Sequence, residues 1–214
     1  MQRIRPRALA ALTAILIAAT LTAAPASAAP RGLPELPTLD LARTQLAELT
    51  RAEEHSMMGY DRTLFRHWGT HADNCDTREL VLARDGDNVT RDAACRAVTG
   101  TWISLYDKVV ITSASNVDID HIVPLAAGWR SGAWEWDAAK RKAFANDLTH
   151  PQLLAVSAKS NRSKGDQTPA TWRPPARDSW CDYSKAWSHV KSIYRLSVTE
   201  AERSALTEML DTCT

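Results

Sequence analysis

The sequence predicts an α+β fold, in which a small strand–strand–helix unit is embedded in a mainly helical single domain. Residues 116–124 alternate between two faces and stop at Pro124, which cannot donate to a strand ladder. Residues 153–156 form a second short apolar run, and Ser157 can cap the helix that follows it. Helical patterns recur in the rest of the chain, at residues 39–57, 135–146, 183–196 and 199–210.

The first 28 residues have the three parts of a secretory signal peptide. A start with three arginines precedes an apolar, alanine-rich run at residues 8–24, and residues 26–28 offer a small-residue cleavage site. The run is borderline in length for a membrane span, but alanine and threonine dilute it. We therefore expect residues 1–28 to be removed, and a secreted, extracellular protein with no stable membrane association.

Residues 29–38 are rich in proline and predict a flexible lead-in, and residues 39–214 predict one domain. This length is enough for a single hydrophobic core. Because three arginines leave with the signal peptide, the formal charge changes from +1 to −2, so the mature chain is not globally basic. Any contact with nucleic acid must therefore depend on local positive charge.

The chain has four cysteines, Cys75, Cys95, Cys181 and Cys213, and is expected in an oxidising compartment. An even number there predicts two disulfides, for which three pairings are possible. We favour Cys75–Cys95 and Cys181–Cys213, because each closes a local loop, which stabilises by ~3 kcal/mol. A structural zinc site is the alternative, but no two cysteines have the C-x2-C spacing that such sites use.

Residues 60–68 and 100–112 carry the next predicted elements. Leu64, Phe65 and Trp68 in the first segment predict core packing. The second segment predicts one or two strands with a turn near Asp107, which lead the chain to the strand at residues 116–124.

An acidic residue and a histidine, Asp120 and His121, stand next to each other in that strand. Carboxylates are rarely buried unless they are paired or bind a metal, and a buried hydrogen-bonded pair is the structural alternative. Asp120-His-Ile-Val-Pro124, followed by Leu153-Leu-x-x-Ser-x-x-x-Asn161-Arg-x-Lys164, resembles the HNH, or ββα-metal, nuclease motif. The flanking sequence resembles the secreted HNH-family endonucleases of actinobacteria over most of the chain after Tyr60.

The resemblance implies metal-dependent hydrolysis of phosphodiester bonds. It implies that Asp120 and the side-chain carbonyl of Asn161 hold the metal and that His121 is the general base. The ordinary imidazole pKa of ~6.5 suits proton transfer at neutral pH. Mg²⁺ is the expected cofactor because it takes oxygen ligands and keeps several waters, and Mn²⁺ or Ca²⁺ would use the same ligands.

Several cations are candidates for the phosphate. Arg162 and Lys164 lie in the motif helix. Nucleases of this kind also need a cation near the scissile phosphate, and the guanidinium of Arg62, Arg66 or Arg78 would match the phosphate oxygens. We name Arg78, beside a predicted disulfide, as the candidate to reach the active site, with a structural salt bridge as its alternative.

The chain departs from the family pattern at one position. Many HNH proteins have an asparagine in the second strand region that orients the histidine, and here Gln152 occupies the nearest matching place. Its amide carbonyl can accept from an imidazole N–H. Asn146 and His150 are close by in the sequence, and Asp118 is a further candidate partner.

Residues 126–151 form an insertion between the two motif strands. Three tryptophans, the first of them Trp129, predict packing at the start of its helix rather than stacking on nucleobases. Lys140 and Arg141 belong to a short basic run that either contacts the DNA backbone or forms an ordinary solvated helix face.

We therefore expect a secreted, monomeric, Mg²⁺-dependent endonuclease that cuts DNA, or RNA, with little sequence specificity. The alternative is a secreted non-catalytic module that binds nucleic acid or sugar and has a degenerate motif. Convergence of Asp120, His121 and Asn161 in one place would favour the enzyme. A metalloprotease is disfavoured because the chain has no H-E-x-x-H sequence.

Overall fold

Helices and short strands share the described part of the chain, so the fold is α+β, as the sequence predicts. The computed structural model describes residue 1 and residues 32–214, and most of the predicted signal peptide lies outside the described residues. The elements in chain order are α1 (Leu39–Glu48), α2 (Thr77–Asp85), β1 (Asp87–Arg91), β2 (Ala97–Ile103), β3 (Val110–Ile111), β4 (Val117–His121), α3 (Leu125–Arg130), α4 (Ala138–Ala145), β5 (Leu153–Ser157), α5 (Ala158–Lys164), α6 (Trp180–Tyr194) and α7 (Glu200–Leu210).

The predicted strand–strand–helix unit consists of β4, β5 and α5. β4 and β5 pair antiparallel, with His121 opposite Leu153. Pro124 follows β4 and opens α3. The hydroxyl of Ser157 accepts a hydrogen bond from the Ser160 N–H at 3.2 Å, so α5 begins where β5 ends. The unit therefore places the end of β4 beside the length of α5.

β1, β2 and β3 form a separate antiparallel sheet. Trp102 of β2 is buried in the smaller of the two hydrophobic cores, and its indole N–H donates to the Leu82 carbonyl at 2.9 Å. Gly100 has a φ of +159°, and a Cβ at this position would lie 2.5 Å from the Trp102 ring. The indole therefore requires glycine at residue 100.

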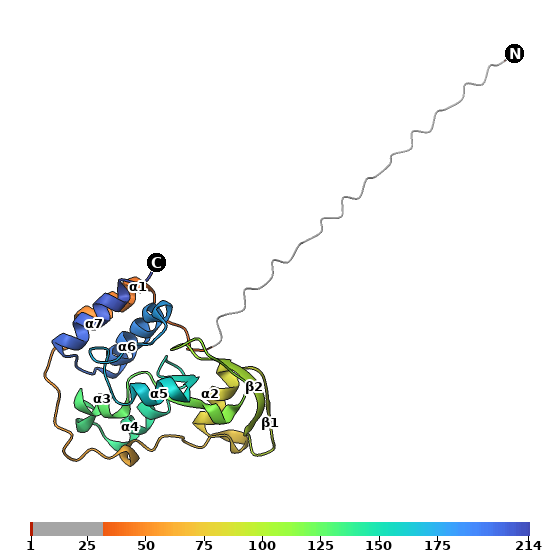
Figure 1. The fold of residues 1–214 in the computed structure, drawn as a ribbon, viewed down its shortest axis with the longest axis horizontal. Coiled ribbons are helices and arrows are strands. Elements are labelled where there is room, and N and C mark those ends of the chain that lie inside the picture. Colours follow the sequence, from red (N-terminus) through yellow and green to blue (C-terminus); the bar gives the residue numbers. More distant parts are fainter. Residues whose placement is uncertain (2–31) are drawn as a thin grey trace.

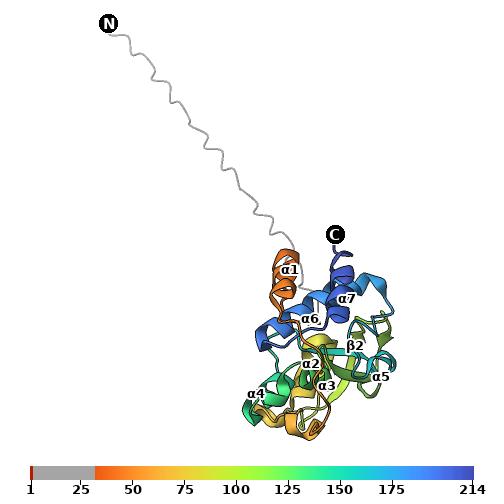
Figure 2. The same cartoon turned by 90° about the vertical axis from the view of Figure 1, so that its left-hand side faces the viewer.

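Helices α1, α6 and α7 lie side by side at one end of the molecule, although α1 comes first and the other two come last (Figures 1 and 2). A buried ion pair joins the last two, with Lys191 Nζ 2.6 Å from Glu202 Oε1. The Trp187 indole N–H donates to the same carboxylate at 2.5 Å. No helix in residues 32–214 is long and apolar enough to span a bilayer.

α1 is shorter than predicted, because it ends at Glu48 rather than near residue 57. The next segment pairs with the chain before α7 instead. The Ala52 N–H donates to the Val198 carbonyl at 3.1 Å, and the Val198 N–H donates to the Thr50 carbonyl at 2.9 Å. These tertiary bonds use the backbone groups that a longer helix would have paired internally.

Both predicted disulfides are present. Cys75 is bonded to Cys95 and Cys181 to Cys213, across sequence separations of 20 and 32 residues. The described residues include no free cysteine, so none is left to ligate a structural zinc. The second disulfide ties the start of α6 to the end of the chain.

Candidate active site

One pocket, of about 280 Å³, lies at the end of β4 against α5. Its walls bring together Asp120, His121 and Asn161, together with three charged residues, Arg62, Arg162 and Asp166. A larger cavity of about 730 Å³ lies between the lead-in and β2, but its walls are mostly apolar and bring no such set of residues together. Chemistry rather than volume therefore identifies the smaller pocket as the candidate active site.

Asp120 is 5% exposed and is surrounded by donors. The Tyr106 hydroxyl donates to Oδ2 at 2.5 Å, and Lys164 Nζ lies 2.8 Å from Oδ2 and 3.1 Å from Oδ1. Burial raises the pKa of the Asp120 carboxyl, and the Lys164 ammonium opposes that rise. Two oxygens have about four acceptor positions, so these three contacts from two donor groups leave room for one further partner.

The structure contradicts the expectation that Lys164 holds a phosphate. Its side chain is 0% exposed, and Nζ also donates to the His121 carbonyl at 2.9 Å. A lysine with no exposed surface cannot reach a nucleic-acid backbone. Arg162 differs, because its side chain is 78% exposed and it lines the pocket, so its predicted contact with phosphate stays a prediction.

His121 is buried with its ring stacked on Trp68, at 5.7 Å between centroids. Its Nε2 lies 2.9 Å from the Ala145 carbonyl, which can only accept, so Nε2 carries the hydrogen and Nδ1 has the free lone pair. Burial lowers the pKa of His121 to about 3. The imidazole is therefore neutral at physiological pH, which is the form that a general base requires.

The structure corrects the role expected of Gln152. Its Oε1 accepts from the Val123 N–H at 3.1 Å and its Nε2 donates to the Val123 carbonyl at 2.9 Å, so the amide fixes the turn after β4. The Ala145 carbonyl, at the end of α4, orients His121 in its place. Every residue has a carbonyl, so no sequence signal could have identified this one.

Two of the other three orienting candidates, Asn146 and His150, also have different partners. Asn146 Oδ1 accepts from the Gly69 N–H at 2.6 Å and from the Thr77 hydroxyl at 2.7 Å. His150 Nδ1 lies 2.8 Å from Asp147 Oδ2. Both residues thereby hold the loop that follows Ala145, and neither bonds to His121.

Asn161 faces the pocket from α5. Its Nδ2 donates to Asp118 Oδ2 at 3.0 Å, which leaves Oδ1 of the amide free to face another partner. Within residues 32–214, no three His, Cys, Asp or Glu side chains gather as a metal site. Asp120 and Asn161 share the pocket and are the residues that could hold a metal there, and two oxygen ligands fit a cation that keeps its waters.

Two of the arginine candidates differ in whether they reach the pocket. Arg78 Nη1 donates to Glu79 at 2.7 Å, and Nη2 donates to the carbonyls of Ala114 and Val117 at 3.1 and 3.3 Å, so Arg78 braces the start of β4 and does not line the pocket. Arg62 lines the pocket instead; its positive charge opposes the rise that burial causes in the pKa of Asp120 and adds to the fall that burial causes in the pKa of His121. Its position in the segment at residues 60–68 was the available signal.

The two basic residues predicted to bind DNA from α4 do not line the pocket. Arg141 donates to the carbonyls of Ala133 and Trp134 at 3.1 and 3.4 Å, so its guanidinium is used inside the protein. Lys140 is exposed and lies 4.3 Å over the Trp136 ring. Arg141 is only partly buried, so the predictions for Arg141 and Lys140 both stay predictions.

Acid is expected to destabilise the protein through His121. The folded pKa of about 3 lies below the ordinary ~6.5, so the unfolded chain binds the proton first as the pH falls. This contribution to stability is complete above pH ~6.5 and is lost as the pH falls toward 3, at up to about 1.4 kcal/mol per unit. Urea unfolding of the metal-free protein at pH 7 and pH 4.5 measures the loss.

His121→Gln is the control for this titration. Between the two pH values the wild type should lose roughly 2–3 kcal/mol more than the variant, because glutamine does not titrate. Equal losses in the two proteins would show that His121 is not held neutral by burial.

Two comparisons place the chain among known proteins. The family model described as "GmrSD restriction endonucleases, C-terminal domain" matches residues 77–209, more than half of the chain and all of the strand–strand–helix unit. No solved structure matches.

A protein of Arthroderma benhamiae (strain ATCC MYA-4681 / CBS 112371), named "Uncharacterized secreted protein", is 49% identical over 200 residues, which cover 94% of this chain and 97% of that protein. Its name agrees with the secretion predicted from the leader. It is a fungal protein, so the expected link to actinobacteria is not confirmed. The chain belongs to the family of GmrSD restriction endonuclease C-terminal domains.

Proposed function

We propose that this protein is a secreted, metal-dependent endonuclease of the HNH, or ββα-metal, type that cuts DNA, with RNA as the alternative substrate, at low sequence specificity. The proposal is carried by the meeting of Asp120, His121 and Asn161 in one pocket with Arg62. Membership of a restriction-endonuclease family supports the nuclease class. The leader and the secreted relative support an extracellular site of action.

The donor set suits a hard divalent cation. Asp120 Oδ1 and Asn161 Oδ1 would hold Mg²⁺, and Mn²⁺ or Ca²⁺ would use the same oxygens. Such a cation supplies charge stabilisation at the phosphate and at the leaving oxygen. Asp118 contributes by holding Asn161 Nδ2, which fixes the direction of the amide oxygen.

His121 accepts the proton of the attacking water at Nδ1, because Ala145 holds the hydrogen of Nε2. A phosphate anion in the pocket favours the protonated imidazole and so raises the low pKa of His121 toward neutrality. Arg62 and Arg162 bind the phosphate oxygens, which supplies positive charge on the pocket wall of a chain that is not basic overall.

A non-catalytic binding module is the second candidate, and one observation favours it. Lys164 Nζ lies 2.8 Å from Asp120, so a predicted metal ligand already has a cationic partner. If this ammonium excluded a metal, the motif would be degenerate. The two candidate functions differ in whether the protein cleaves phosphodiester bonds when a metal is added.

Supercoiled plasmid should be nicked by the mature, disulfide-bonded protein in Mg²⁺ and not in EDTA. His121→Ala should slow nicking by ~100-fold or more, because that is the usual loss with a general base. Asn161→Ala should raise the Mg²⁺ concentration that gives half the maximal rate. His189→Ala is the matched control, since His189 is half-buried on α6 outside the pocket. Nicking that persists in EDTA or in His121→Ala would contradict the proposal.

Arg62→Gln should raise KM for DNA more than it lowers kcat, with about a tenfold loss in kcat/KM, because a charge-assisted phosphate contact is removed. Arg66→Gln is the control, because Arg66 ends the same short 3-10 helix, Arg62–Phe65, but does not line the pocket. Steady-state rates on a fluorescent oligonucleotide measure both. A similar loss in the two variants would show that Arg62 has no special contact.

A further inference from the structure

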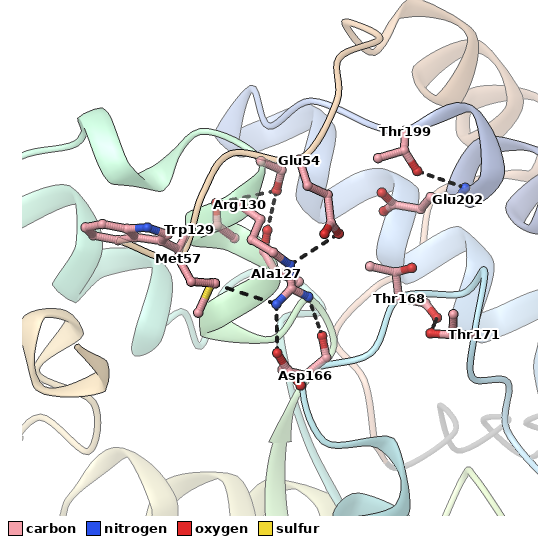
Figure 3. A network of polar contacts seen from close by, with 12 residues as sticks. Glu54, Met57, Ala127, Trp129, Arg130, Asp166, Thr168, Thr171, Thr199 and Glu202 are labelled. Carbon is pink, nitrogen blue, oxygen red and sulfur yellow. Dashed lines mark hydrogen bonds and ion pairs between the residues drawn. The ribbon is translucent and has the colours of Figure 1, made fainter. Parts of the chain in front are cut away.

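A guanidinium clamp lies at the edge of the candidate active site. Arg130 is the last residue of α3, and Asp166 follows the end of α5 on the pocket wall. Arg130 Nη1 donates to Asp166 Oδ2 and Nη2 donates to the Asp166 carbonyl, each at 2.7 Å (Figure 3). One side chain thus fixes both the carboxylate and the backbone of a single residue.

Arg130 is itself held from the opposite side. Its Nε lies 3.2 Å from Glu54 Oε1, and Figure 3 shows the guanidinium between Glu54 and Asp166. The Arg130 side chain is 13% exposed, against 61% for Asp166. The arginine is therefore the buried partner of the pair, and the aspartate is the exposed one.

The position of Asp166 makes this clamp relevant to the pocket. Its carboxylate shares the pocket wall with Arg62 and Arg162, where the proposed function places a phosphate anion. The hydrogen bond from Arg130 holds the pKa of Asp166 below its ordinary value, so the carboxylate is charged at neutral pH. A free carboxylate here would repel the phosphate and compete for the two cations.

We propose that Arg130 is a positioning residue that keeps the Asp166 carboxylate paired and away from the phosphate. The inference rests on the proposed function and adds a residue that touches neither metal nor substrate. It also explains how a pocket with an acidic residue on its wall can accept a polyanion. Nothing in the motif itself indicates Arg130, which lies far from Asp166 in the sequence.

The test compares substrate kinetics of Arg130→Gln with those of the double variant Arg130→Gln/Asp166→Asn. The single variant should raise KM for an oligonucleotide roughly fivefold, with a smaller change in kcat, because an unpaired charge faces the phosphate across water. The double variant should return KM to near the wild-type value. Loss of packing alone would not be rescued by removing the Asp166 charge.

Two controls keep the comparison sharp. Arg43 also pairs with an aspartate and a backbone carbonyl, at the end of α7, with Nη2 2.7 Å from Asp211 Oδ1 and 3.3 Å from the Leu210 carbonyl, so Arg43→Gln should leave KM unchanged. Thermal melts check that each variant is folded. If Arg130→Gln does not fold, Arg130→Lys with and without Asp166→Asn repeats the test, because lysine cannot make both contacts in the same geometry.

An unchanged KM in the single variant, or a double variant as impaired as the single one, would overturn the inference. Wild-type protein that cuts no nucleic acid in any divalent metal would overturn the proposed function and the inference with it. The two failures are distinguishable, because the first requires an active wild-type enzyme.

Discussion

The buried contact between Lys164 and Asp120 holds together the two segments from which the site is built. Asp120 comes from β4 and Asn161 from α5, and Lys164 is three residues after Asn161 on the same helix. Its ammonium binds the Asp120 carboxylate and the His121 carbonyl, so it fixes the helix against the strand at the level of the pocket. A buried ion pair is costly unless its remaining hydrogen bonds are satisfied, and the Tyr106 hydroxyl supplies one of them.

The same contact sets the electrostatics of the pocket. With one buried ammonium against one carboxylate, the pair is close to neutral, so an added cation would not meet a large excess of negative charge. Affinity for a metal would then depend on the phosphate as a further ligand, as is usual for Mg²⁺. Arg62, Arg162 and the paired Asp166 would bias the pocket toward the nucleic acid rather than toward free metal.

Much of the fold could be predicted from the sequence, because its signals are local. Short-range geometry determines the alternation in residues 116–124, the Ser157 cap and the local cysteine pairs. The structure accordingly contains β4, α5 and both disulfides. The predicted end of the first helix was wrong, because backbone hydrogen bonds with Val198 override the helical pattern of the sequence.

The shell around the site could not be predicted in the same way. The motif points to Asp120, His121 and Asn161, which share one pocket, but the partner of His121 is a main-chain carbonyl, and Arg78 bonds to the backbone before and within β4. The predicted contact of Lys164 with a phosphate was wrong for a different reason. A lysine in a basic helix is normally solvated, and only the tertiary structure shows that this one is buried against a carboxylate.

The most direct test of this account is a crystal structure of the disulfide-bonded protein soaked in Mn²⁺, with anomalous scattering used to locate the ion. We expect one ion in the pocket, bound by Asp120 Oδ1 and Asn161 Oδ1, with Lys164 still bonded to Asp120 and Nδ1 of His121 facing the pocket. Mn²⁺ bound elsewhere, or absent from this pocket at saturating concentration with a nucleic-acid fragment present, would contradict the proposed metal-dependent site.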